Sequence, residues 1–256
     1  MRSKEPRTAN SVSTSCARGY AALSCCLVCL LIVGTLGCQT SATGYNIDGV
    51  RSYQTGNFPQ ALQDFQQALQ VDAANPDAYY NLAATYHELG RQNRDPALMQ
   101  QAEGLYHQCL DLSPNHAECY RGLAALLVQT DRAQSAFTLL QRWSERNYQS
   151  ADARIELARL YEEFGDQQSA VRYLTEALEV DSKSPRAWTA LGRIREQQGQ
   201  LAQALSNYQQ AYAINTFQPG VAERIATLQR SLSTSAGSVG NGGTQMVTIP
   251  TVPVQR

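Results

Sequence analysis

The chain has 256 residues, of which 21 are basic and 22 are acidic, and its formal net charge at pH 7 is -1. A near-neutral chain lacks the excess of positive charge that nucleic-acid binding requires, so we predict no nucleic-acid partner. Glycine and proline recur at intervals and do not cluster in loops, which favours a repeat protein over a single compact core.

The N-terminal segment has the order of an export signal. Residues 1–20 are polar and basic, and residues 21–36 are almost wholly apolar. From Gly34 to Cys38 the chain reads Gly-Thr-Leu-Gly-Cys, which resembles a bacterial lipobox. The resemblance implies cleavage before Cys38 and lipid on its thiol, so residues 1–37 are predicted to be a lipoprotein-type signal peptide.

The predicted lipid on Cys38 would tether the chain to a membrane, because each buried methylene of an acyl chain contributes about 0.8 kcal/mol. The residue after the cysteine is Gln39. An aspartate at this position would resemble a signal for retention at the inner membrane. The leader therefore implies a bacterial cell envelope, on the periplasmic face of the outer membrane. The alternative is an uncleaved anchor in the inner membrane, although the apolar run is short against the roughly 20 residues that span a bilayer.

Helical hairpins are predicted to begin after the leader. Pro76 suits the first position of a helix, and Gly90 is expected to end that helix in a left-handed turn. The residues between them form one apolar face at helical spacing: Tyr79, Leu82, Ala83 and Tyr86.

The same pattern returns from Ala151 and from Pro185, and this template resembles the tetratricopeptide repeat. The resemblance implies an all-α, right-handed superhelical solenoid of helix-turn-helix hairpins. Within residues 38–218 the aligned anchors give five repeats, at residues 42–75, 76–116, 117–150, 151–184 and 185–218.

Three segments depart from the regular repeat. In the long second repeat, residues 91–94 are predicted to be a loop, and Asp95 is predicted to cap an early-starting, lengthened second helix. Residues 219–232 carry an apolar face and are predicted to be a capping helix, because the last hairpin would otherwise expose its core. Residues 233–256 contain glycine and proline without periodicity and are predicted to be a disordered tail.

The cysteines and histidines do not indicate a metal site, a cofactor or an enzyme. Cys109 occupies a place that usually holds a buried alanine, so we expect a free thiol there, with a disulfide to Cys119 as the alternative. None of the three histidines pairs with another at the i, i+4 spacing of a helical zinc site. No group of side chains forms a catalytic constellation.

In stacked hairpins the first helices line a concave groove, where we expect a protein or peptide partner. The candidate contact residues lie off the core stripe of these helices: Tyr80, His87, Arg121, Arg159, Glu162, Arg193 and Glu196. A clamp for a terminal carboxylate, which some tetratricopeptide co-chaperones use, is not expected. Of the five matching positions, Asn46, Val50, Asn81, Glu118 and Gly122, only Asn81 fits that clamp.

These patterns predict a scaffold or assembly factor for protein-protein interaction, held in a bacterial envelope by lipid on Cys38. The plan resembles pilotin-type lipoproteins and lipoproteins that recruit cell-wall enzymes. Two alternatives stay open, namely an inner-membrane-anchored adaptor with an uncleaved N-terminal helix and a non-catalytic subunit of an envelope enzyme complex.

Overall fold

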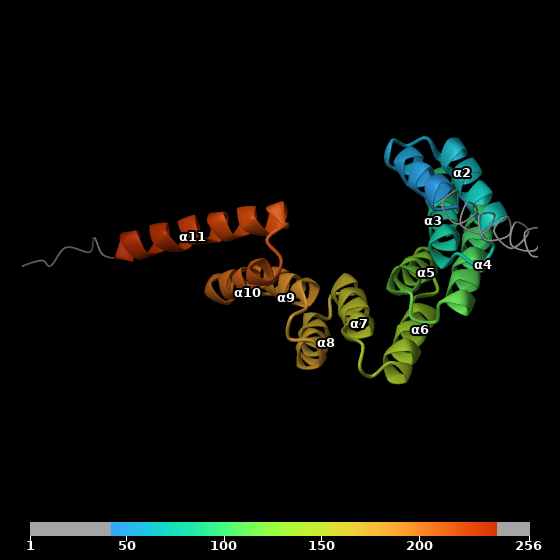
Figure 1. Ribbon diagram of the computed structural model, residues 1–256. Coiled ribbons are helices and arrows are strands. Elements are labelled where there is room, and N and C mark those ends of the chain that lie inside the picture. The colour runs from blue at the N-terminus through green and yellow to red at the C-terminus, as the bar shows by residue number, and fades with distance from the viewer. Residues whose placement is uncertain (1–41, 240–256) are drawn as a thin grey trace, which may run out of the picture. The chain divides into compact units, whose positions relative to one another are not determined.

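The computed structural model describes residues 42–239, with side chains to residue 234, and every regular element in this part is an α-helix (Figure 1). The chain is helical over residues 42–54. The helices that follow are α2 (Phe58–Val71), α3 (Pro76–Asn93), α4 (Pro96–Leu112), α5 (Ala117–Gln129), α6 (Ala133–Arg146), α7 (Ala151–Glu163), α8 (Gln167–Val180), α9 (Pro185–Gln197), α10 (Leu201–Ile214) and α11 (Pro219–Val239). The predicted all-α fold is confirmed.

The described residues form two compact units, which meet in the sequence between Leu126 and Leu127, inside α5. In the first unit, α2 packs on α3 and α3 packs on α4. In the second unit, each helix from α6 to α11 packs on the next along the chain. Contacts between neighbouring elements predominate in both units, as expected where each hairpin buries its apolar face against the next.

Side-chain caps begin several of the helices. The carboxamide of Asn75 accepts a hydrogen bond from the backbone N–H of Ala78, and Pro76 occupies the first turn of α3. Asp95 accepts from the backbone N–H groups of Ala97 and Leu98, ahead of Pro96 in α4. These bonds satisfy amide groups that have no partner within their own helix. The predicted cap at Asp95 is therefore confirmed.

A residue in the left-handed region lies in the turn inside each of the five hairpins. Glycine takes this conformation in three of them, with φ of 76° at Gly56, 80° at Gly165 and 73° at Gly199. Arg94 takes it in the second hairpin with φ of 53°, and Asp131 in the third with φ of 59°. The third hairpin thus turns without a glycine, because the aspartate tolerates this backbone conformation better than most side chains.

The prediction that α3 ends at Gly90, before a loop over residues 91–94, is wrong. The helix continues to Asn93, and Arg94 forms its left-handed C-cap. Gly90 is buried inside the helix, where an added Cβ would lie 2.9 Å from the sulfur of Met99. Glycine at this position therefore permits close packing of α3 on α4. The extra length of this repeat extends both helices, to 18 and 17 residues.

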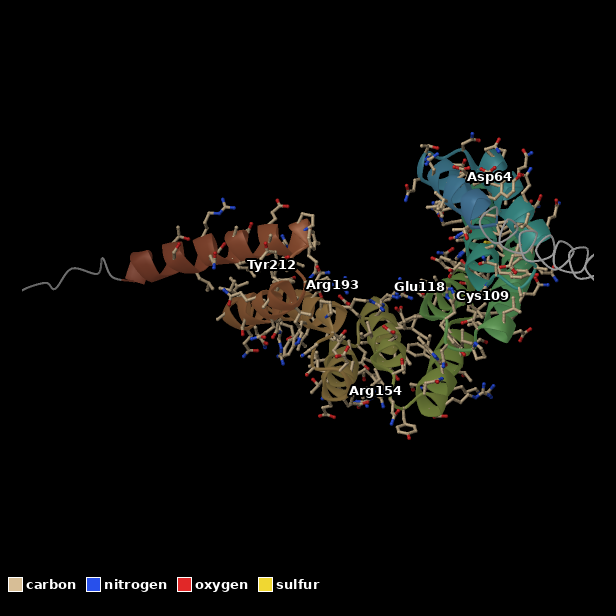
Figure 2. All side chains as sticks on the ribbon, in the orientation of Figure 1. Asp64, Cys109, Glu118, Arg154, Arg193 and Tyr212 are labelled. Carbon is tan, nitrogen blue, oxygen red and sulfur yellow. A yellow bond between two sulfur atoms is a disulfide. The ribbon has the colours of Figure 1, made fainter. Side chains whose placement is uncertain are left out.

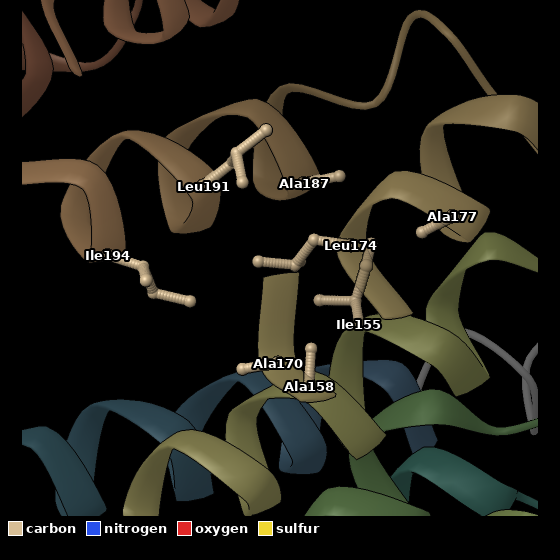
Figure 3. Close-up of a cluster of buried hydrophobic side chains, with 8 residues drawn as sticks. All are labelled: Ile155, Ala158, Ala170, Leu174, Ala177, Ala187, Leu191 and Ile194. Carbon is tan, nitrogen blue, oxygen red and sulfur yellow. The ribbon is translucent and has the colours of Figure 1, made fainter. Parts of the chain in front are cut away.

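Small residues in the second helix of each hairpin let its partner helices approach closely. Ala61, Ala102, Ala170 and Ala204 are each fully buried. Figure 3 shows one resulting core in the second unit, between α7, α8 and α9. Its buried members are Ile155, Ala158, Ala170, Leu174, Ala177, Ala187, Leu191 and Ile194. The cluster combines alanine with larger branched side chains, and such combinations let neighbouring helices pack closely.

The helix α11 covers the end of the second unit. Val221 and Leu228 are buried against residues of α10, with Ile225 packed beside them. A helix that packs on the last hairpin was predicted from this apolar face. The predicted start of the tail at residue 233 is wrong, because α11 continues to Val239. Each residue added to an existing helix gains a backbone hydrogen bond, and no proline interrupts this stretch.

Several predictions fall outside the described residues. These are the signal peptide, the lipid-bearing Cys38 and the tail from residue 240 onward. Within residues 42–239, no helix is both long enough and apolar enough to cross a bilayer.

Candidate functional site

A cavity of about 200 Å³ opens in the first unit between the helix over residues 42–54 and α3. Its lining residues are Val50, Tyr53, Gln54, Phe65, Tyr80, Asn81 and Ala84. The first helices of two successive repeats form its walls, and Phe65 enters from α2. An added Cβ at Gly49 would lie 2.5 Å from the Phe65 ring, so the glycine makes room for this aromatic side chain.

Hydrogen-bonding groups lie among the apolar walls of this cavity. The side-chain amide of Asn81 donates to the side-chain oxygen of Asn46 over 3.0 Å, which fixes the orientation of Asn81. Burial raises the pKa of Tyr53, and the nearby carboxylate of Glu88 adds to the effect. The Tyr53 hydroxyl therefore stays protonated at neutral pH and able to donate a hydrogen bond.

The predicted groove residue Tyr80 lines the cavity, whereas His87 does not. His87 is only 9% exposed, and its Nδ1 lies 3.3 Å from the hydroxyl of Tyr106. The prediction that His87 offers a contact surface is therefore corrected, because α3 is rotated so that this residue faces α4. Burial also raises the pKa of Tyr106, so its hydroxyl stays protonated beside the histidine. Arg121, the third candidate in this unit, is half-buried on α5.

Tyr80 is the one candidate contact residue that lines the cavity, and sequence reasoning did not place Val50, Tyr53, Gln54, Phe65 or Asn81 in a binding site. The signal was present, because Val50 and Tyr53 repeat at helical spacing over residues 42–54, as Tyr80 and Ala84 do on α3.

In the second unit, acidic side chains of α7 pair with basic side chains of α9. The guanidinium of Arg186 lies 2.6 Å from Asp152 and also contacts Glu156, which is only 1% exposed. Further along the two helices, Arg193, which is labelled in Figure 2, lies 2.6 Å from Glu162. These pairs join the first helices of two successive repeats, since α7 and α9 each begin a hairpin.

Two further contacts extend this series of ion pairs. Within α7, Arg159 lies 3.2 Å from both Glu156 and Glu163. Between α9 and α11, Arg224 lies 3.0 Å from Glu196. We call the pairs among α7, α9 and α11 the ion-pair ladder.

The structure places all four candidate residues of this unit, Arg159, Glu162, Arg193 and Glu196, in the ion-pair ladder. Their charges already have partners inside the chain, so a ligand would have to compete with those partners. Contact of these residues with a binding partner stays a prediction.

The expectation of a free thiol at Cys109 is wrong, because Cys109 and Cys119 form a disulfide. Cys109 lies in the last turn of α4 and Cys119 in the first turn of α5, and their Cα atoms are 6.6 Å apart. The short connection between the two helices brings both residues to the same interface, where each is fully buried. The disulfide therefore joins the second repeat to the third.

Family models of the tetratricopeptide repeat match most of the described chain. A model described as "TPR repeat" matches residues 49–90, and two described as "Tetratricopeptide repeat" match residues 99–160 and 155–219. The matched residues include the cavity walls on α3 and the ion-pair ladder on α7 and α9.

Curated relatives share the repeat at low identity. The BBSome complex member BBS4 homolog of Drosophila melanogaster is 28% identical over 184 residues, which is 70% of this chain and 37% of that protein. Superkiller complex protein 3 of Mus musculus is 23% identical over 226 residues, which is 75% of this chain and 14% of that protein. The chain thus spans well under half the length of either relative.

Two solved structures resemble the fold. The thermophilic TPR protein TTC0263 of Thermus thermophilus has a TM-score of 0.56 and 22% identity, covering 74% of this chain and 99% of that one. PilF of Pseudomonas aeruginosa has a TM-score of 0.51 and 16% identity, covering 80% of this chain and 90% of that one. The paired helices, the family models and these structures agree, and the chain belongs to the tetratricopeptide-repeat family.

Proposed function

We propose that this protein is a scaffold or assembly factor that is tethered to a bacterial cell envelope by lipid on Cys38 and binds a segment of a partner protein in the cavity of the first unit. The family supports the general role, because tetratricopeptide-repeat proteins are typically non-catalytic scaffolds for protein-protein interaction. The leader sequence supports the tether, because it resembles a lipobox that ends at Cys38.

The cavity is the observation that supports a partner-binding site in the first unit. Its volume of about 200 Å³ is below the roughly 300–1,000 Å³ of typical small-molecule sites, which favours one side chain of a peptide over a whole cofactor. Val50, Phe65 and Ala84 supply apolar walls, and Asn81 supplies a fixed carboxamide for a peptide backbone. The partner segment would therefore present a Leu-sized or Phe-sized residue.

Filling the cavity tests this site. Ala84→Phe would occupy the space that the partner side chain needs, whereas Ala84→Ser leaves it open. Because burial of one large apolar side chain contributes about 1.5–3 kcal/mol, we expect Ala84→Phe to weaken capture by about tenfold to a hundredfold. Equal capture by the two variants, with unchanged circular dichroism, would reject the cavity.

A photo-crosslinking amino acid at position 80 provides an independent readout in native cells. The matched control carries the same amino acid at Tyr148, which is 67% exposed and lies away from the cavity lining. We expect one partner to be captured from position 80 and not from position 148, and to be lost with Ala84→Phe. A crosslinking pattern common to both positions would indicate nonspecific contact.

Metabolic labelling with a fatty acid tests the tether separately from the cavity. We expect the cell to produce a shortened, labelled protein, and Cys38→Ser to abolish both the label and the cleavage. An unlabelled, uncleaved protein that stays in the inner membrane would favour the uncleaved anchor. Neither result affects the cavity, because the two experiments perturb different segments.

A further inference from the structure

Three potential metal ligands lie together where α4 meets α5. The sulfurs of Cys109 and Cys119 and a ring nitrogen of His116 lie within 4.8 Å of one another. Both cysteines are fully buried, whereas the His116 side chain is 10% exposed. Figure 2 shows Cys109 near the end of α4 and Glu118 at the start of α5, beside this cluster.

The hydrogen bonds of His116 define which of its nitrogens can bind a metal ion. Its Nε2 lies 2.9 Å from a carboxylate oxygen of Asp77, and since a carboxylate only accepts, Nε2 carries the proton. Its Nδ1 accepts from the backbone N–H of Cys119 over 3.3 Å. The neutral tautomer satisfies both bonds, and its one lone pair, on Nδ1, is directed at the backbone N–H of Cys119 in the disulfide state. A metal ion can bind Nδ1 only when it replaces this N–H. A carboxylate on the far nitrogen is the arrangement that orients metal-binding histidines.

The spacing of the cysteines also suits a metal ion. Their Cα atoms are 6.6 Å apart, near the upper end of the range of about 4.4–6.8 Å that a disulfide spans. A tetrahedral zinc ion lies about 2.3 Å from sulfur and about 2.0 Å from nitrogen, which separates its ligand atoms by roughly 3.5–3.8 Å. Rotation of the two cysteine side chains can open the sulfurs to that distance.

The surroundings favour a positive ion. A carboxylate oxygen of Glu118 lies 3.5 Å from Nδ1 of His116. Cys119 lies in the first turn of α5, where the helix dipole stabilises the negative charge of a thiolate. Asp77 is 71% exposed at the outer edge of the cluster, so an ion can approach from solvent along the His116 side.

We propose that Cys109, Cys119 and His116 form a second, reduced-state site that binds a divalent ion of the zinc class. A dithiol reductant supplies two electrons and two protons to the disulfide, which yields two thiols and the oxidised form of the reductant. The metal ion then displaces both thiol protons to solvent, replaces the backbone N–H of Cys119 at Nδ1 of His116, and is bound by two thiolates and that nitrogen. Because the same sulfurs serve both states, the disulfide and the metal site exclude each other.

Both states would link α4 to α5. Asp77 acts as a positioning residue, since it contacts the nitrogen that faces away from the ion. The predicted result is a junction between the second and third repeats that is closed by a disulfide under oxidising conditions and by a metal ion under reducing conditions.

Cobalt binding tests this proposal in the full-length chain in detergent. The four cysteines of the leader and Cys38 would compete for the ion, so the parent protein carries Cys16→Ser, Cys25→Ser, Cys26→Ser, Cys29→Ser and Cys38→Ser. The parent is reduced with a phosphine under anaerobic conditions and titrated with Co²⁺, and then with Zn²⁺. The oxidised parent is the matched control, because it has the same sequence but no thiolate.

We expect the reduced parent to bind one Co²⁺ per chain with thiolate-to-cobalt charge-transfer absorption, which Zn²⁺ then removes. The oxidised parent should show no such band. His116→Gln should weaken Co²⁺ binding by at least a hundredfold, and Asp77→Asn should weaken it by about tenfold, as expected for an outer partner of a ligand. Circular dichroism of each oxidised variant establishes that it is folded.

Either of two outcomes overturns the proposal. One is a reduced, folded parent that shows no charge-transfer band at millimolar Co²⁺. The other is unchanged Co²⁺ affinity in His116→Gln, which would leave only a thiol pair that binds metal without the histidine.

Discussion

Replacement of one buried carboxylate in the ion-pair ladder should destabilise the second unit far more than replacement of its exposed neighbour. Arg186 contacts two carboxylates, those of Asp152 and Glu156. Asp152 is 48% exposed, whereas Glu156 is 1% exposed and also accepts from Arg159 over 3.2 Å. One guanidinium therefore supplies an internal comparison between an exposed and a buried partner.

The expected magnitudes follow from this difference in exposure. A hydrogen bond to a charged group contributes about 1.5–3 kcal/mol, and Glu156 accepts from both Arg159 and Arg186. Because the amide of Glu156→Gln keeps one acceptor, we expect a loss of about 3 kcal/mol, equivalent to about 6–12 °C in Tm. Asp152→Asn should cost at most about 1 kcal/mol, since water and salt screen an exposed pair.

Urea denaturation followed by circular dichroism measures both losses, and a double-mutant cycle with Arg186→Gln isolates each pair. The coupling energy of Arg186 with Glu156 should lie in the range of about 0.5–3 kcal/mol that is found for residues in contact, and should exceed its coupling with Asp152. If Asp152→Asn and Glu156→Gln lower stability equally, burial does not set the strength of these ion pairs and the reasoning is refuted.

Three further predictions concern the packing, the disulfide and the titration of this fold. Gly192→Ala would place a Cβ 2.9 Å from the ring of Tyr208, and we expect it to lower the free energy of unfolding by about 1–3 kcal/mol in urea denaturation. At Gly104 an added Cβ would have nothing within 4 Å, so Gly104→Ala should raise the free energy of unfolding by up to about 1 kcal/mol. Equal effects of the two substitutions would contradict this explanation. Cys109→Ala with Cys119→Ala should lower the free energy of unfolding by about 2.7 kcal/mol, which is the loop-closure entropy for a sequence separation of 10. A change below about 0.5 kcal/mol would indicate that the disulfide does not constrain the unfolded chain. The pKa of Tyr208 is raised to about 12 from 10.0, first by burial, so its contribution to stability is complete below pH 10 and is lost as the pH rises through about 12. Tyr208→Phe should flatten this alkaline loss, and an unaltered alkaline unfolding curve would exclude Tyr208 as its source.

Local residue chemistry accounts for what sequence reasoning predicted correctly. The start of α4 depends on Asp95 and Pro96, which are adjacent in the chain, so neither the cap nor the proline needs information from elsewhere. The apolar faces of the helices follow from spacing along a single element. The covering helix α11 was found in the same way, from an apolar face that includes Val221 and Leu228.

The errors occurred where one residue type serves two purposes. Glycine both adopts left-handed turns and permits close packing, and only the position of Met99 against Gly90 shows which purpose applies there. A cysteine that replaces a buried alanine fits a free thiol and a disulfide equally well. The choice depends on where Cys119 lies, which the turn between α4 and α5 sets.

The candidate site shows the same difference between what local sequence predicts and what contacts between helices decide. From sequence it was clear that Tyr80 and Arg193 lie on first helices, because helical periodicity is a local property. It could not be foreseen that Tyr80 lines a cavity with Val50 and Phe65 while Arg193 pairs with Glu162, since those partners lie on other helices of the array.

The sequence by itself determined that this chain is a series of helical hairpins, because caps, turns and apolar spacing act over a few residues. Only the tertiary structure decided which side chains of those hairpins meet. It brought Cys109, His116 and Cys119 together in one cluster. It also paired the predicted groove residues Arg159, Glu162, Arg193 and Glu196 with opposite charges inside the chain. The physical reason is that contacts between successive helices depend on the rotation and spacing of each helix, which packing fixes and local periodicity does not.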